Sequence, residues 1–170
     1  MGRKSVKANK NIYQITREAL GLSREKASEI LAGLTNNKIE KIENERETPR
    51  PEEILIMSKG YKTPHLCNYY CSHDCPIGKE YVPEIKTKDL SQIILEVLAY
   101  LNAMDEQKER LIEITHDGKI DNCEIDDFIY IQQELEKLSV AVETLQLWSE
   151  KMLAEGKIDR DEYEKRNKKA

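Results

Sequence analysis

Residues that interrupt helices are scarce in this chain of 170 residues, and valine is scarce as well. It contains 7 glycines and 5 prolines, and the only valines after Val82 are Val97, Val140 and Val142. With few helix breakers and few valines, the composition predicts an all-α protein. The prolines, at positions 49, 51, 64, 76 and 83, all fall in one stretch. We interpret that stretch as the punctuated region between two helical blocks.

Long apolar runs and cysteine-rich frameworks are also absent. The most apolar stretch, IILEVLAYL, is nine residues long and contains Glu96, so it is too short and too polar to cross a membrane. Four cysteines are too few for a typical disulfide-stapled secreted miniprotein. The basic start, residues 1–10, is not followed by the apolar segment of a signal peptide. We therefore expect a cytoplasmic protein whose thiols stay reduced.

Charge is divided unevenly along the chain. The whole chain has 27 Lys and Arg against 32 Asp and Glu, a formal net charge of −5, which at first argues against binding to nucleic acid. Residues 1–88 carry 16 basic and 12 acidic side chains, a net +4, whereas residues 89–170 carry 11 and 20, a net −9. The first block therefore has the sign that a phosphate-binding surface needs. The alternative is a helical surface on which charges simply alternate.

Four short helices are predicted in the first block, each bounded by capping residues. Their approximate limits are 11–21, 23–33, 35–45 and 51–61. Ser23 and Thr35 are favoured N-cap residues, glycine is favoured just after a helix, and Pro51 suits a first helical position. In the first helix, helical spacing predicts an apolar buried face made of Ile12, Ile15, Ala19 and Leu20.

The second and third of these helices resemble a known DNA-binding motif. The segment GLSREKASEILAGLTNNKIEKIENERETP is similar to the helix-turn-helix family of lambda repressor and Cro, also called the xenobiotic-response-element type. The matching residues are Gly21, Leu22, Ser23, Leu34, Thr35, Ile39, Ile42, Glu43, Asn44 and Pro49. The resemblance covers about residues 9–66. It implies a sequence-specific transcriptional regulator that binds double-stranded DNA as a homodimer.

The resemblance places the candidate DNA contacts at the starts of the second and third helices. Arg24 is expected near a phosphate. The residues expected near base edges and the backbone are Thr35, Asn36, Asn37, Lys38 and Lys41. An arm made of Arg3, Lys4, Lys7 and Lys10 is either a further contact to the DNA backbone or minor groove or a solvated terminus.

Two departures from the family pattern favour a different use of the same fold. The turn before the third helix is one residue longer than usual, at Ala32-Gly33. The third helix also carries Glu40 and Glu43, and carboxylates that face phosphates oppose binding. The alternative function is therefore a protein-interaction adaptor built on a helix-turn-helix scaffold without DNA binding.

Cysteine and histidine gather in the segment HLCNYYCSHDCPIGK, whose YC-x3-CPIG sequence resembles an extension found in a subgroup of helix-turn-helix proteins. Cys67, Cys71 and Cys75 recur every four residues, and His73 lies between the last two. These four side chains suit a closed zinc site, and three thiolates with Cys123 suit an iron–sulfur cluster or a redox sensor. The same spacing also fits simple packing, because free cysteine is often buried as a small hydrophobe.

Two apolar stripes predict long helices in the last part of the chain, the first capped by Thr87. The first stripe consists of Leu90, Ile94, Val97, Leu101 and Met104. After a break at Asp117-Gly118, the second consists of Phe128, Ile131, Leu135, Leu138, Val142, Leu145 and Met152. This heptad spacing is typical of antiparallel or coiled-coil-like helices. They pair either within one chain, as a hairpin, or between two chains, as a dimerisation module.

The predicted organisation is a helix-turn-helix domain of four or five helices over residues 1–66, a connector over 67–86, and a helical dimerisation or regulatory domain over 87–170. No nucleophile–base pair, glycine-rich phosphate loop or inward carboxylate pair can be placed in a pocket. We therefore expect no enzyme. The sequence predicts a DNA-binding regulator that forms a homodimer and does not enter a membrane.

Overall fold

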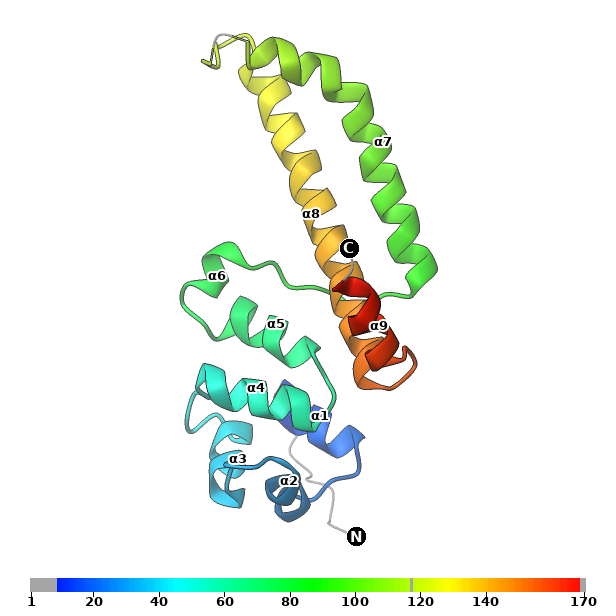
Figure 1. The fold of residues 1–170 in the computed structure, drawn as a ribbon. Helices are drawn as coiled ribbons and strands as arrows, with labels where there is room; N and C mark the ends of the chain where they lie inside the picture. The colour runs from blue at the N-terminus through cyan, green and yellow to red at the C-terminus, as the bar shows by residue number, and fades with distance from the viewer. Residues whose placement is uncertain (1–8, 117, 169–170) are drawn as a thin grey trace. The chain divides into compact units, whose positions relative to one another are not determined.

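The computed structural model describes residues 9–116 and 118–168, and these form nine helices and no strand, which confirms the all-α prediction (Figure 1). The helices are α1 (Ile12–Ala19), α2 (Arg24–Ile30), α3 (Asn36–Glu43), α4 (Pro51–Gly60), α5 (His65–His73), α6 (Gly78–Tyr81), α7 (Leu90–Ile114), α8 (Ile125–Ala154) and α9 (Arg160–Asn167). They belong to two compact units. The first unit comprises the described residues of Met1–Glu84 and Glu150–Ala170, and the second comprises Ile85–Ser149.

The short helices of the first unit begin where side chains cap them. The Ser23 hydroxyl accepts a hydrogen bond from the Lys26 amide at 3.2 Å, and the Thr35 hydroxyl accepts one from the Lys38 amide at 3.3 Å. Pro51 is the first residue of α4, where its missing N–H has no consequence. The predicted starts of α2, α3 and α4 are thus confirmed.

The core of the first unit is built from one face of each of the helices α1 to α5. Its buried side chains are Tyr13, Ala27, Leu31, Leu34, Ile39, Ile42, Ile54, Met57, Tyr61 and Leu66. For α1 the predicted face is wrong, because Ile15 and Leu20 are each 48% exposed while Tyr13, Gln14 and Arg17 are buried. Arg17 is turned inward because the Glu43 carboxylate and the Leu22 carbonyl accept its hydrogen bonds, which an apolar-periodicity rule cannot detect.

The segment expected to be a connector, residues 67–86, forms α5 and α6, and α5 packs against the same core. Cys67, Tyr69 and Tyr70 contact the buried cluster. The Tyr13 hydroxyl of α1 donates a hydrogen bond to the Asp74 carboxylate at 2.6 Å. Together with burial, this bond raises the pKa of Tyr13 well above its ordinary value. The core therefore extends past the four helices of the helix-turn-helix region.

The second unit is an antiparallel hairpin of α7 and α8 (Figure 1). Asp89, not the predicted Thr87, caps α7, since its carboxylate accepts the Gln92 amide at 3.0 Å. Near the far end, Arg110 Nε donates to the Asp127 carboxylate at 2.7 Å. Ile93, Ile114, Ile131 and Ala141 are buried between the helices. Within a single chain, α7 and α8 therefore pair with each other as a hairpin, which was one of the two predicted alternatives.

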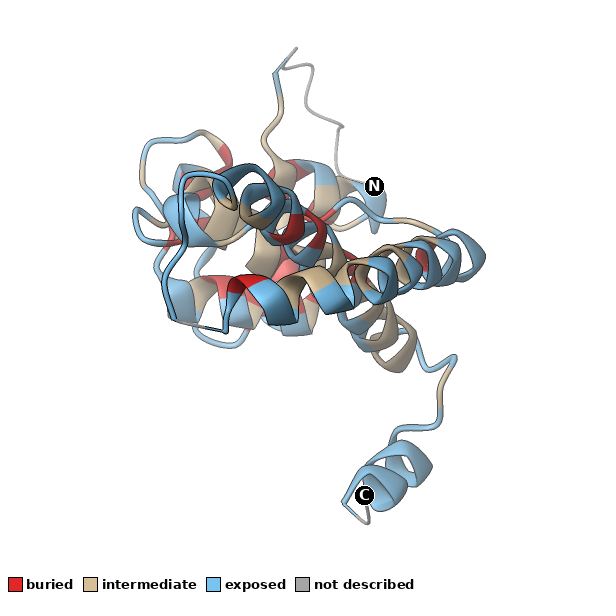
Figure 2. Cartoon of the chain, turned by 90° about the horizontal axis from the view of Figure 1, so that it is seen from above, coloured by how far each residue is buried: buried red, intermediate tan, exposed pale blue. Residues whose placement is uncertain are grey.

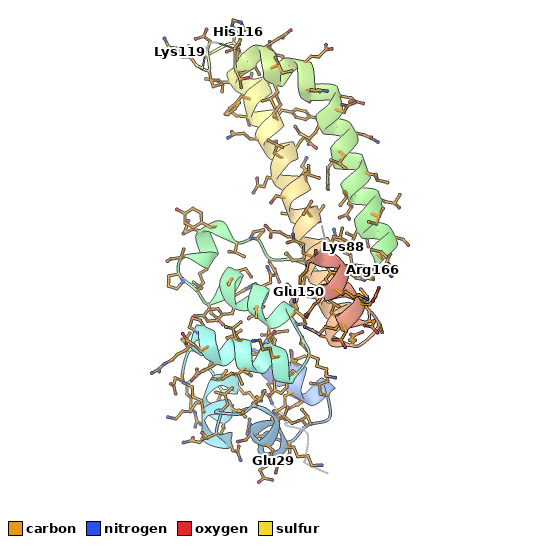
Figure 3. All side chains as sticks on the ribbon, viewed as in Figure 1. Glu29, Lys88, His116, Lys119, Glu150 and Arg166 are labelled. Atoms are coloured by element: carbon orange, nitrogen blue, oxygen red, sulfur yellow. The ribbon has the colours of Figure 1, made fainter. Side chains whose placement is uncertain are left out.

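The ends of the hairpin and of the chain are exposed. In the turn, His116 and Lys119 project outward (Figure 3). Gly118, three residues after the Thr115 C-cap of α7, has a left-handed φ of 73°, while Asp117, the other half of the predicted break, lies outside the described residues. Helix α9 has no buried residue and is pale blue along its length in Figure 2. None of the helices in the described segments combines the length and apolar composition that crossing a bilayer requires.

Candidate nucleic-acid interface

Helices α2 and α3 are joined by a turn whose geometry depends on small residues. Gly33 has a φ of 102°, which side-chain-bearing residues rarely adopt. The Ser28 hydroxyl donates to the Leu34 carbonyl at 2.8 Å, and Leu34 is buried in the core. The longer turn at Ala32-Gly33 is accommodated in this way, and α3 starts directly after it at Asn36.

A buried ionic cluster ties α1, α2 and α3 to one another. The Glu43 carboxylate is fully buried and accepts hydrogen bonds from Arg17 Nε at 2.5 Å, Arg17 Nη2 at 2.9 Å and Arg24 Nε at 2.7 Å. Arg17 Nη1 also donates to the Leu22 carbonyl at 2.5 Å. The hydrogen bonds to Glu43 raise the pKa of Arg17, against the effect of burial. The cluster (Arg17, Arg24 and Glu43) fixes how α3 is presented.

This cluster corrects the expectation that Glu43 opposes DNA. Its carboxylate points into the unit, where two guanidinium groups neutralise it, so it does not face an approaching phosphate. Glu40 remains partly exposed and lies 3.9 Å from Arg46. Of the two carboxylates predicted to repel phosphate, only that of Glu40 is therefore accessible, and it has a cationic neighbour.

The outward face at the start of α3 is polar. Thr35, Asn36 and Asn37 are exposed, and Lys41 is exposed one turn further on. The opposite face of the same helix is buried through Ile39 and Ile42 together with Glu43. Four of the predicted contact residues therefore share one accessible surface.

Lys38 and Lys41 are accompanied by carboxylates from the following segment. Lys38 Nζ is hydrogen-bonded to Glu47 and lies 3.1 Å from the Glu53 carboxylate, while Lys41 Nζ lies 3.8 Å from Glu47. The Lys38 bond raises the pKa of that lysine and lowers the pKa of Glu47. A phosphate at this surface therefore competes with carboxylates that are already in place.

Arg24 has a structural role that the sequence did not indicate. Its Nε bond to Glu43 holds the guanidinium at the beginning of α2, with 30% of its side chain accessible. In the predicted arm, Lys10 is bound to Glu18 at 2.6 Å. Arg3, Lys4 and Lys7 lie outside the described residues. The pairing of Arg17 with Glu43 was not predicted. Its one signal in the sequence was the presence of opposite charges on helices with few apolar side chains.

The cysteine segment contains the four side chains of the candidate metal site, Cys67, Cys71, His73 and Cys75. Among the described residues, no three His, Cys, Asp or Glu side chains are grouped so that they could hold a metal ion. His73 stacks on Tyr69 at 4.2 Å, and its Nδ1 lies 2.9 Å from the Ser72 hydroxyl. Cys75 Sγ accepts the Gly78 amide at 3.4 Å.

The environment of the thiols fits packing better than ligation. Cys67 lies against the core, and burial together with the neighbouring thiols raises the pKa of Cys71, which disfavours a thiolate ligand. Cys123, the fourth ligand of the predicted iron–sulfur cluster, is exposed and belongs to the other unit. Of the three interpretations of the segment, structural packing is the one that agrees with these contacts.

Comparisons with known proteins add no relative, since no protein-family description, curated protein or solved structure matches this chain.

Proposed function

We propose that this chain is a sequence-specific regulator of transcription that binds double-stranded DNA as a dimer and has no catalytic activity. The observation that carries the proposal is the exposed polar start of α3, with Thr35, Asn36 and Asn37 outside and Ile39 and Ile42 buried beneath. In helix-turn-helix proteins the start of the second helix of the motif enters the major groove. An asparagine amide there both donates and accepts hydrogen bonds, which matches the edge of adenine.

The first test is whether the chain selects a DNA sequence. A random duplex pool is enriched on the full-length chain at low salt, and binding to the selected duplex is compared with binding to a scrambled one by fluorescence anisotropy. We expect selective binding that weakens steeply with salt. If no duplex is retained at low salt, the proposal is overturned.

Asn37→Ala is expected to weaken binding to the selected duplex by roughly 5-fold to 150-fold, because a bidentate contact to a base contributes about 1–3 kcal/mol. Binding to the scrambled duplex should change little, since that contact carries sequence information. The matched control is Asn102→Ala, which removes an exposed asparagine from α7 in the second unit. Equal losses on both duplexes would show that Asn37 does not read a base.

A second candidate function, an adaptor that binds protein and not DNA, is favoured by the carboxylates around Lys38. The carboxylates of Glu47 and Glu53 are paired with the Lys38 ammonium group, which a phosphate would otherwise bind. In this alternative the α3 surface recognises a polar peptide surface, and its lysines are part of intramolecular ion pairs.

Glu47→Gln distinguishes the two candidates. If α3 binds DNA, removing this carboxylate frees Lys38 for a phosphate, and affinity should rise roughly threefold to tenfold, with the salt slope steeper by about 1. Glu29→Gln is the control, because Glu29 is an exposed carboxylate of α2 that points away from the other helices of its unit (Figure 3). An equal gain in both variants would indicate a general charge effect and not a contact made by Lys38.

A further inference from the structure

One side of the α7–α8 hairpin exposes a row of apolar side chains on α7. The row consists of Leu90, Ile94, Leu98, Leu101 and Ile112, whose exposed fractions lie between 38% and 62%. At 3.6 residues per turn these five positions fall within a stripe of about 80°. The stripe lies beside the row that contains the buried residues Ile93 and Ile114, so α7 has a second apolar face that α8 does not cover.

Helix α8 adds a matching row on the same side of the hairpin. Phe128, Leu135 and Val142 recur every seven residues, and Leu135 and Val142 are 45% and 40% exposed. On both helices the exposed row follows the buried row in the same rotational sense. Because the helices are antiparallel, the two rows point to one side. We call this surface, formed by the five α7 residues and these three α8 residues, the apolar hairpin face.

The two sides of the hairpin differ in charge. On the α8 part of the apolar hairpin face, the positions between the apolar residues are filled by Gln132, Ser139 and Gln146, all uncharged. The opposite side holds a groove whose lining includes four charged side chains, and its residues are Lys88, Glu96, Tyr100, Gln133, Glu136, Lys137, Val140 and Ala141. Depletion of charge at the centre of a surface is typical of protein interfaces.

The size of the apolar hairpin face fits a stable interface. Helix α7 has 25 residues, so it is about 38 Å long, and two packed helices present a face about 18–20 Å wide. The product is about 700 Å², close to the roughly 800 Å² per partner of a standard interface.

We propose that the apolar hairpin face pairs with the same face of a second copy of this chain, and that the two hairpins form a four-helix bundle in which α7 of each copy lies on α8 of the other. The pairing names the surface of the dimer that the proposed function requires, but it does not depend on DNA binding. A face that is apolar and uncharged over the first half of the α7 row, with seven-residue spacing on α8, is what two identical hairpins need in order to associate.

The register of the bundle follows from which residues of α7 and α8 lie at the same height along one hairpin. Arg110 is bonded to Asp127, and Tyr100 lines the same groove as Lys137, so residues whose numbers sum to about 237 lie at one level. A two-fold axis parallel to the helices keeps these levels. It therefore places Ile94 of one copy beside Val142 of the other, and Leu101 beside Leu135.

The opposite orientation of the second copy fits poorly. The apolar residues of α7 lie mostly in its first half, which is level with Leu135 and Val142 of α8. The second half of the α7 row contains Asp105 and Lys108. A two-fold axis perpendicular to the helices would set the apolar half of one copy against these charges, which would then lose water without a matched partner.

The first experiment measures the mass of the full-length chain in solution without DNA, by sedimentation equilibrium. We expect twice the 19.8 kDa of one chain. Leu101→Glu should raise the dissociation constant of the dimer by roughly tenfold or more, because it places a charge in the interface. The control is Leu95→Glu, since Leu95 is 69% exposed on another side of α7 and its replacement should leave the constant within about twofold.

Helical circular dichroism shows whether each variant is folded. If Leu101→Glu has lost helix, Ile94→Gln tests the same face with a smaller change. A monomeric wild-type chain at micromolar concentration would overturn the proposal, and so would equal weakening by Leu95→Glu and Leu101→Glu. Because DNA is absent, these outcomes are independent of whether the chain binds a duplex.

The second experiment tests the register. Ile94→Asp and Val142→Lys should each produce monomers, because each puts an unpaired charge opposite an apolar side chain. Mixing the two variants should restore dimers, since the mixed pair contains one Asp–Lys contact and one unchanged Ile–Val contact. If mixing the two variants does not restore dimers, the proposed bundle with its parallel two-fold axis is contradicted.

Discussion

Glu43→Gln is expected to lower the free energy of unfolding of the first unit by about 3–5 kcal/mol. The carboxylate is fully buried and accepts three hydrogen bonds from Arg17 and Arg24. An amide has about the same size but no charge, and its NH₂ group would face guanidinium donors. The side chain of Arg17, which is 7% accessible, would then hold a buried positive charge with no compensating anion.

The loss is best measured by hydrogen exchange of the α3 amides, because that readout reports the first unit separately from the hairpin. A loss of 3 kcal/mol corresponds to exchange that is faster by about 150-fold when it occurs through unfolding of the unit. Glu40→Gln is the matched control, since it makes the same change on the same helix at a position with an accessible carboxylate. Comparable acceleration in both variants would show that the ionic cluster adds no special stability.

Gly78→Ala is expected to cost about 3 kcal/mol or more and to detach α6 from α5. A Cβ atom at this position would lie 2.1 Å from the Cys71 carbonyl oxygen and 2.7 Å from its carbonyl carbon. Both are backbone atoms of a helix, so they cannot turn aside as the end of a flexible side chain can. The two helices would have to separate.

Limited proteolysis measures this separation, because a detached α6 becomes a site of cleavage. We expect cleavage between α5 and α7 in Gly78→Ala at protease concentrations that leave the wild-type chain intact. Lys79→Ala is the control, because it removes an exposed side chain from the next position of the same helix. Resistance of Gly78→Ala equal to that of the control would mean that α6 is not held against Cys71.

Both variants address how the presentation of α3 is supported. The ionic cluster joins α1, α2 and α3, whereas α5 and α6 close the core behind them through the Tyr13–Asp74 bond and the Cys71–Gly78 approach. In the proposed function neither Glu43 nor Gly78 touches DNA. Their loss should weaken DNA binding only in proportion to the fraction of unfolded chain, unlike Asn37→Ala, which should weaken it without affecting stability.

Local features of the fold were readable because they depend on neighbouring residues alone. Ser23, Thr35 and Pro51 predicted the starts of three helices, since a cap involves a side chain and an amide only three residues away. The all-α class followed from the scarcity of glycine, proline and valine. Thr87 was a wrong choice of cap because Asp89, two residues later, offers the same kind of acceptor. Capping preferences alone do not decide between two favourable cap residues that lie so close together.

Features that depend on distant residues were not readable. Periodicity assigned Ile15 and Leu20 to the core, but Arg17 is buried in their place because Glu43, 26 residues away, provides its charge partner. Because of the same ion pair, Glu43 is buried inside the unit, whereas the sequence predicted that its carboxylate would oppose DNA binding. The cysteine spacing allowed ligation as well as packing, and the contacts around Cys67, Cys71 and Cys75 favour packing.

The sequence by itself determined that this protein is helical, where its short helices begin, and which side chains lie at the start of α3. Those properties follow from capping, propensity and helical spacing, which act within one turn or two. Only the tertiary structure decided which charges are internal, that α5 joins the core, and that part of the heptad row remains outside the α7–α8 hairpin. A buried charge is tolerated only beside an opposite charge, and an apolar row is covered only if another element reaches it.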